Sequence, residues 1–187
     1  MSNQVQAPFG NFATVRMALE VRDRLVGPVA GALGAWTVRE AAESVLYVET
    51  EPDLADTAVF CEAYDVAPES SANCVVVAAK RGGNTVLAAC LVLADSRVDV
   101  NNAVRRHLGA RKASFASLDL VVAETGMEYG GVTPVGLPLG WPLLIDEAVA
   151  HTPYVLVGSG QRRGKLILPG SALAQLPGAE VLSGLGV

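Results

Sequence analysis

Two long apolar runs dominate the pattern of hydrophobic and polar positions along the chain. CVVVAA at 74–79 and TVLAACLVLA at 85–94 are rich in aliphatic and β-branched residues, and the polar, glycine-containing segment 81–84 lies between them. Continuous apolar runs of this length are typical of buried strands. The short glycine-rich turn predicts that the two strands pair as an antiparallel hairpin.

Shorter patterns predict strands and helices on both sides of this hairpin. Strands are expected at 45–48, at 143–149 leading into a helical turn, at 152–160, at 165–168 and around 181. Helices are expected at 13–26, 53–65, 100–108, 117–124 and 171–176. Gly27-Pro28 is expected to end the first helix, Asp53 or Asp56 to cap the second, Asp99 to cap the third, and Ser117 to begin the fourth.

The order of these elements indicates the fold class. Strands and helices alternate, but the hairpins favour a mixed sheet over a wholly parallel one, and the prediction is an α+β fold. Residues 1–12 are expected to form a loose N-terminal arm, and residues 13–187 a single domain. No internal repeat divides the chain.

Composition excludes several classes of protein. The chain of 187 residues is 51% hydrophobic and 18% charged, which excludes a disordered protein. It has 3 cysteines without C-x-x-C spacing, so we expect reduced thiols and a cytoplasmic location. His107 and His151 are far from any cysteine motif, so no metal site and no cofactor are expected. The uncharged stretch 129–145 contains three prolines, and no membrane segment is expected.

Charge is distributed unevenly along the chain. The net charge is −5, but residues 1–73 carry 4 basic and 11 acidic residues, or −7, and residues 74–187 carry 10 and 8, or +2. An extended basic face for nucleic acid is therefore not expected. The asymmetry permits a local site for an anion in the second part.

Two glycine-rich loops are the strongest candidates for chemistry. In GGVTP (130–134), the glycines allow close backbone approach, and successive N–H groups could form a nest for an oxyanion. GSGQRRGK (158–165) could cradle a phosphate, with Arg162, Arg163 or Lys165 adding charge, although it lacks Walker A spacing. An ordinary Gly/Pro turn and a hairpin turn with solvated arginines are the alternative interpretations.

Several segments, taken in order, resemble the YbaK family, also described as the prolyl-tRNA synthetase insertion-domain or Cys-tRNA(Pro) deacylase-like family. The resemblance spans about residues 40–182. It includes the hairpin and the helix before it, NNAVRRHLGARKASFAS, the Gly-x-x-x-Pro element from Gly130 to Pro134 with Asp146 after it, and YVLVGSGQRRGKLILPGSAL. The resemblance implies a largely antiparallel, curved sheet surrounded by helices.

The resemblance also implies a function, namely hydrolysis of the ester of a mischarged aminoacyl-tRNA. Synthetase pockets cannot fully reject near-isosteric amino acids, so such editing is needed. The expected partners are a tRNA acceptor end and an aminoacyl-tRNA synthetase, and no metal is implied. The site implied for catalysis is Asn73, Gly130, Gly131 and Thr133, and that implied for substrate binding is Pro134, Asp146, Gly158, Ser159, Gly160 and Arg162.

One position departs from the family pattern. The family has a lysine just before the first hairpin strand, and the matching residue here is Asn73, an amide without charge. Lys80 is seven residues further along, about 23 Å away in an extended strand. Arg111, Lys112 or Arg162 could bring a cation through the fold. A non-catalytic binding module for a nucleotide, an aminoacyl ester or a protein, and a homologue that binds no ligand, are the alternative functions.

Overall fold

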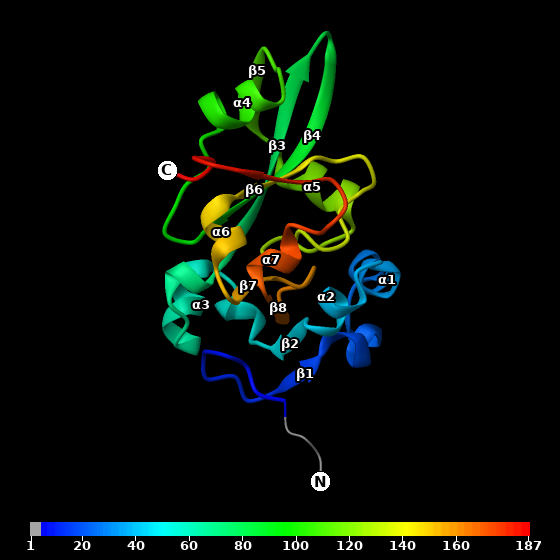
Figure 1. Cartoon of the computed structure of the whole chain (residues 1–187), viewed down its shortest axis with the longest axis vertical. Helices are drawn as coiled ribbons and strands as arrows, with labels where there is room; N and C mark the ends of the chain where they lie inside the picture. Colours follow the sequence, from blue (N-terminus) through cyan, green and yellow to red (C-terminus); the bar gives the residue numbers. More distant parts are fainter. Residues whose placement is uncertain (1–4) are drawn as a thin grey trace.

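Over residues 5–187, the part of the chain that this computed structural model describes, the strands form two sheets (Figure 1). The first has the order β1 (Val15–Met17), β2 (Leu46–Glu49), β8 (Gly164–Leu168) and β7 (Val155–Gly158). The second has the order β5 (Lys112–Phe115), β3 (Ala72–Arg81), β4 (Asn84–Leu93), β6 (Leu143–Asp146) and β9 (Ala179–Leu182). The predicted α+β class with a largely antiparallel arrangement is confirmed.

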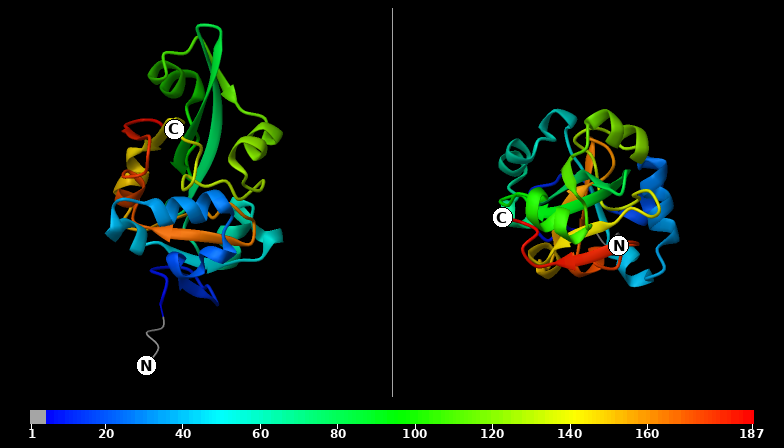
Figure 2. Two further views of the ribbon diagram at one scale, coloured as in Figure 1. Left: turned by 90° about the vertical axis from the view of Figure 1, so that its right-hand side faces the viewer. Right: turned by 90° about the horizontal axis from the view of Figure 1, so that it is seen from above.

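The β3–β4 hairpin is the longest element of the second sheet and rises above the rest of the molecule (Figure 2). Its strands pair in antiparallel register from Ala72 with Leu93 to Arg81 with Asn84, as the two apolar runs predicted. Gly82 and Gly83 form the turn with φ of 55° and 85°, a conformation that glycine adopts without a steric penalty. At its lower end, β3 meets the first sheet through a parallel bridge between Ser71 and Leu156.

The remaining strands of the second sheet come from distant parts of the chain. β6 runs parallel to β4, and β9 runs parallel to β6, so the sheet is mixed, as expected. β5 pairs antiparallel with the outer edge of β3 and was not predicted. Its sequence, KASF, has one buried residue, Ala113, and so lacks the apolar pattern of a strand. The hydrogen-bonded pairing with β3 holds these residues in the strand conformation.

The prediction of a helix over residues 13–26 is wrong. Residues 15–17 are β1, paired with β2, and Ala18–Arg24 is a 3₁₀ segment in which Val21 leaves helical geometry. The apolar spacing fits a helix, but hydrogen bonds along the free edge of β2 decide the outcome. Gly27-Pro28 begins helix α1 (Gly27–Ala35) instead of ending one, because proline fits the first turn, where no N–H donor is needed.

The other helices are short and lie mostly where the sequence predicted them. They are α2 (Arg39–Glu43), α3 (Thr57–Tyr64), α4 (Arg105–His107), α5 (Leu118–Thr125), α6 (Glu147–His151) and α7 (Gly170–Leu173). A π-helical turn, Val100–Val104, precedes α4, and 3₁₀ turns form at Pro52–Leu54 and Pro68–Ser70. The Asp99 side chain caps as predicted, and the Ser117 side chain caps α5, which begins at the next residue. Asp56 is at the N-cap position of α3, but its carboxylate makes no capping bond.

Helix α3 covers one face of the first sheet. Phe60 on α3 is 1% exposed and packs with Val48 and Ile167, while the largest apolar cluster lies on the opposite face of the same sheet. Residues 5–12 form neither helix nor strand, and Phe12 stacks on Tyr64 with ring centroids 5.4 Å apart. Residues 1–4 of the expected arm lie outside the described residues, and the domain division stays a prediction. Within residues 5–187, no helix is long and apolar enough to cross a bilayer.

Candidate functional site

A cavity of about 430 Å³ opens where the lower end of β3 meets the first sheet. Its walls come from the start of α3, the lower half of β3, the end of β5, helix α5, the loop after α5 and the facing ends of β7 and β8. The polar and glycine residues that line it are Asp56, Thr57, Asn73, Tyr129, Gly130, Gly158 and Lys165. The fold thus brings together Asn73, Gly130 and Gly158, three of the predicted site residues.

Asn73 faces the start of helix α3. The Thr57 hydroxyl donates a hydrogen bond to Asn73 Oδ1 over 2.8 Å, which fixes the orientation of the amide. Because the oxygen already has a donor, the two Nδ2 hydrogens are the part of this amide that remains to contact a ligand. Asn73 can therefore act as a hydrogen-bond donor to a carbonyl or phosphate oxygen.

The GGVTP loop rests directly on the loop that follows β7. The Gly160 N–H donates to the Gly131 carbonyl over 2.7 Å, and the Glu128 N–H donates to the Gly160 carbonyl over 2.9 Å. A Cβ on Gly131 would lie 2.6 Å from the Gln161 backbone, so glycine permits this close approach. The two glycine-rich segments therefore form one rigid unit at the cavity.

The N–H groups of the GGVTP loop are not equally available. The Gly131 N–H donates to the Glu128 carbonyl over 3.0 Å. The N–H groups of Gly130 and Val132, two residues that line the cavity, donate to no acceptor within the described residues. The predicted oxyanion nest is thus narrowed to two candidate donors, Gly130 and Val132.

Gly158 separates this loop from strand β8. A Cβ at Gly158 would lie 2.4 Å from the Val132 carbonyl oxygen, so any side chain there would push the loop away. Gly158 is paired with Lys165 across β7 and β8. The absence of a side chain at this position leaves the Lys165 side chain facing the cavity that Gly158 also lines.

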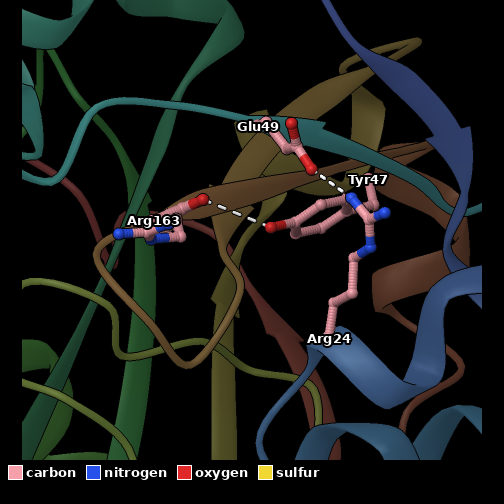
Figure 3. Close-up of polar contacts among 4 residues, drawn as sticks. All are labelled: Arg24, Tyr47, Glu49 and Arg163. Carbon is pink, nitrogen blue, oxygen red and sulfur yellow. Dashed lines mark hydrogen bonds and ion pairs between the residues drawn. The ribbon is translucent and has the colours of Figure 1, made fainter.

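Tyr47 on β2 holds the turn between β7 and β8 in place (Figure 3). The Tyr47 hydroxyl donates to the Arg163 carbonyl over 3.2 Å, and Arg24 pairs with Glu49 beside it. Burial raises the pKa of Tyr47, so its hydroxyl remains a proton donor. Ser159 Oγ adds a bond to the Gly164 carbonyl over 2.8 Å. These bonds fix the start of β8, and with it the position of Lys165.

Arg162 lies at the edge of the cavity, against Gly130. Its Nε donates to the Pro52 carbonyl over 3.0 Å, and its backbone N–H donates to Glu128 Oε2 over 2.8 Å. A Cβ on Gly130, which has φ of 77°, would overlap the guanidinium. Arg162 therefore adds positive charge beside the loop without lining the cavity itself.

Lys165 lines the cavity and is 7% exposed. Burial, followed by the repulsion of Arg162, lowers its pKa to about 8. Its Nζ lies over the Phe60 ring, 5.2 Å from the centroid. The sequence placed Lys165 among three cations of one loop and did not single it out. The sequence signal that could have singled out Lys165 is its position directly before the apolar run LIL, within a strand.

Five predicted site residues have contacts within the protein instead of in this cavity. Thr133 is fully buried, and its Oγ1 accepts the Val135 N–H. Pro134 borders a different cavity. Ser159 and Gly160 make hydrogen bonds that hold the β7–β8 turn and the GGVTP loop in place. Asp146 caps α6 through the Ala148 N–H at 2.9 Å and accepts the Gly186 N–H at 2.8 Å. Their roles toward a substrate stay predictions.

No thiolate nucleophile is indicated at the cavity. Cys74 lines it, but burial raises the pKa of its thiol well above the usual range. Burial likewise raises the pKa of Cys90 to about 12. Across residues 5–187, no three His, Cys, Asp or Glu side chains gather as a metal site would require. The cavity offers amide and backbone donors, one ammonium group and one carboxylate.

Comparisons with known proteins identify the family and support the fold. The model of the aminoacyl-tRNA editing domain matches residues 51–176, more than half of the chain. One similar solved structure belongs to a study of epitope backbone grafting onto scaffold proteins by computational design, with 25% identity and a TM-score of 0.69 over 83% of this chain and 94% of that one. A proposed trans-editing enzyme for prolyl-tRNA synthetase has 23% identity and a TM-score of 0.68 over 84% of this chain and 97% of that one.

A hypothetical protein has 20% identity and a TM-score of 0.71 over 83% of this chain and 99% of that one. A search of the curated proteins finds no match. The structural likenesses below 25% identity support the fold, and the family match over residues 51–176 confirms the resemblance to editing proteins. The chain belongs to the aminoacyl-tRNA editing domain family.

Proposed function

We propose that this protein hydrolyses the ester bond of a mischarged aminoacyl-tRNA in the cavity between Asn73 and the GGVTP loop. The observation that carries the proposal is the free N–H groups of Gly130 and Val132, which lie in the same cavity as the Asn73 amide. Donors of this kind stabilise the negative charge that develops on a carbonyl oxygen during ester hydrolysis. The family match supports aminoacyl-tRNA as the substrate class.

In the proposed reaction, water adds to the ester carbonyl carbon and the carbonyl oxygen becomes an oxyanion. The bond between the acyl carbon and the ribose oxygen then breaks, and the ribose oxygen takes up the proton that the water loses. The products are a free amino acid and an uncharged tRNA. The half-buried Cys74 side chain takes no part, and a hydroxyl of the substrate ribose or a second water relays the proton.

The lining carboxylate has a natural partner in such a substrate. The aminoacyl group carries an α-ammonium next to the ester, and Asp56 is the acidic side chain among the described residues that line the cavity. Asp56 is exposed, and its carboxylate is not used to cap α3. An ion pair between Asp56 and the α-ammonium would orient the ester toward the loop.

The rim of the cavity suits the terminal nucleoside of a tRNA. Phe115 and Tyr129 line the cavity and are 62% and 57% exposed, which is high for aromatic side chains. Unstacked bases bind on such aromatic surfaces, and each stacked base contributes about 1–3 kcal/mol. We assign the terminal adenosine to this rim, with its aminoacyl group directed inward.

Strand β5 links this rim to a basic region at the far end of the hairpin. Lys112 lies directly opposite Lys80 in the β3–β5 pairing, and Arg81 and Arg111 are exposed beside them. Like charges directly opposite each other destabilise a sheet unless an anion lies between them. Phosphates of the acceptor stem are suitable anions, and this arrangement would give binding that weakens with salt.

The experiment measures deacylation of a panel of mischarged aminoacyl-tRNAs by the wild-type protein and by Gly130→Ala. The added Cβ would be strained at φ 77° and would overlap Arg162, so the variant should lose turnover. Gly31→Ala is the matched control, since nothing lies within 4 Å of its Cβ and its φ is unstrained. A wild-type protein that turns over no ester in the panel would contradict the proposal.

A non-catalytic binding module is the second candidate. Asn73 favours it, because an amide supplies no positive charge to the reacting oxygen. The two functions differ in stoichiometry. An enzyme releases many equivalents of amino acid per protein, whereas a module binds the aminoacyl end and leaves the ester intact.

A further inference from the structure

Lys165 is the cationic side chain among the described residues that line the cavity. It is 7% exposed, and within residues 5–187 its Nζ forms neither a hydrogen bond nor an ion pair. Burial of most of this side chain disfavours its charged form, and the contact with the Phe60 ring offsets this only in part. The fold thus holds a positive charge in a cavity that has space for an anion.

The strand register relates Lys165 to Gly158 and Asn73. The bridge between Ser71 and Leu156 is parallel, so extending it by two residues brings Asn73 level with Gly158. Gly158 is in turn paired with Lys165. Asn73, Gly158 and Lys165 all line the cavity at this join between the two sheets. The Lys165 Nζ lies over the Phe60 ring of α3, the helix whose first residue, Thr57, is hydrogen-bonded to Asn73.

The same glycine carries the GGVTP loop. The Gly131 and Val132 carbonyl oxygens lie within 2.5 Å of the position that a Gly158 Cβ would occupy. The Lys165 side chain, the Asn73 amide and the loop residues Gly130 and Val132 line the same cavity. This is the cavity in which the proposed reaction places the ester.

We infer that Lys165 is a catalytic residue whose ammonium holds the carbonyl oxygen of the ester as that oxygen becomes negatively charged. The inference rests on the proposed function. Water adds to the carbonyl carbon, the π electrons move to the oxygen, and Lys165 compensates the new charge without transferring a proton. The positive charge of the site thus comes from β8, across Gly158 from the uncharged Asn73.

Charged groups around Lys165 shift its pKa in opposite directions. Arg162 on the preceding turn favours the neutral amine, whereas Asp56 and Cys61, both on the α3 side, favour the ammonium. With a pKa of about 8, Lys165 is mostly protonated at neutral pH. Turnover above the spontaneous hydrolysis of the ester should therefore fall as pH rises through about 8.

The kinetic test compares Lys165→Met, Lys165→Arg and the wild-type protein. Lys165→Met retains the volume and removes the charge, and kcat should fall about 10²- to 10³-fold with a small change in KM. Lys165→Arg should recover part of the loss. Arg39→Met is the matched control for loss of a charge, since the Arg39 side chain is 82% exposed on α2. Turnover by Lys165→Met at the wild-type rate would overturn the inference.

A binding measurement separates this inference from the proposed function. Two stable analogues of aminoacyl-adenosine are compared, one with an anionic tetrahedral phosphonate in place of the ester and one with a neutral amide. Lys165→Met should bind the phosphonate at least about 10-fold more weakly than the wild-type protein and bind the amide equally well. If Lys165→Met loses affinity equally for both analogues, or loses affinity for neither, the role of Lys165 is overturned even if the ester is hydrolysed. Failure of hydrolysis alone would refute the proposed function.

Discussion

Replacing Lys165 with methionine should stabilise the protein at neutral pH. The fall in pKa from 10.5 to about 8 means that folding disfavours the ammonium, and it corresponds to about 3 kcal/mol. Methionine removes this cost and retains the contact with Phe60. For a chain of this length, about 3 kcal/mol raises Tm by roughly 6–12 °C.

The pH dependence provides an independent test of the same reasoning. Between pH of about 8 and 10.5, the unfolded chain still binds a proton at Lys165 that the folded chain has released. Wild-type stability should therefore rise across this window, because the unfolded state binds more protons. The difference between the wild-type protein and Lys165→Met should be largest below pH 8 and vanish near pH 10.5.

The measurement is thermal unfolding by calorimetry at several pH values, with Arg16→Met, which removes the charge of an exposed residue of β1, as the matched control. The control should change stability by less than about 0.5 kcal/mol at every pH. A Lys165→Met protein that is no more stable than the wild type at pH 7, with the same pH dependence, would refute the assignment of a buried, uncompensated charge. A stabilised variant that has also lost turnover would indicate that the charge serves the reaction.

Four further outcomes follow from the cavity. Gly158→Ala should separate the two loops and abolish turnover, with faster amide exchange in the neighbouring loop as the readout; unchanged exchange would contradict the close packing. Thr57→Val should release the Asn73 amide and lower kcat several-fold, and an unchanged kcat would exclude Asn73 from the site. Phe115→Ala should weaken binding of the terminal nucleoside about 5- to 150-fold by calorimetric titration if stacking contributes 1–3 kcal/mol. Lys112→Gln should reduce the slope of log affinity against log salt by about 1, and an unchanged slope would exclude β5 from the RNA contact.

The hairpin could be predicted from the sequence because its information is local. Two apolar runs and a four-residue turn specify β3 and β4 without help from the rest of the chain. The cap at Asp99 and the start of a helix at Ser117 are also local signals, and the structure shows a cap at Asp99 and a helix from Leu118. The first helix was wrong because Val15 pairs with Val48, a contact across 33 positions that no local pattern contains.

The candidate site could be predicted in part, for the same reason. The glycines of GGVTP and Gly158 were recognisable as places where a backbone could approach a ligand, and Gly130 and Gly158 line one cavity. Nothing local indicated that the Gly131 N–H is used by Glu128 while the N–H groups of its neighbours remain free. Lys165 was recognisable as a charge near a loop, but its place beside Asn73 depends on two strand registers.

The position of the positive charge follows from how the sheets join. An amide at position 73 leaves the lower end of β3 neutral, and the strand next to it contributes only Gly158 at that level. A larger residue at 158 would displace the GGVTP loop, because a Cβ there would lie 2.4 Å from the Val132 carbonyl oxygen. Gly158 thus keeps the loop at the cavity that Lys165 on β8 and Asn73 on β3 both line. If Lys165 stabilises the oxyanion, Asn73 needs only to donate a hydrogen bond, a role that its contact with Thr57 supports.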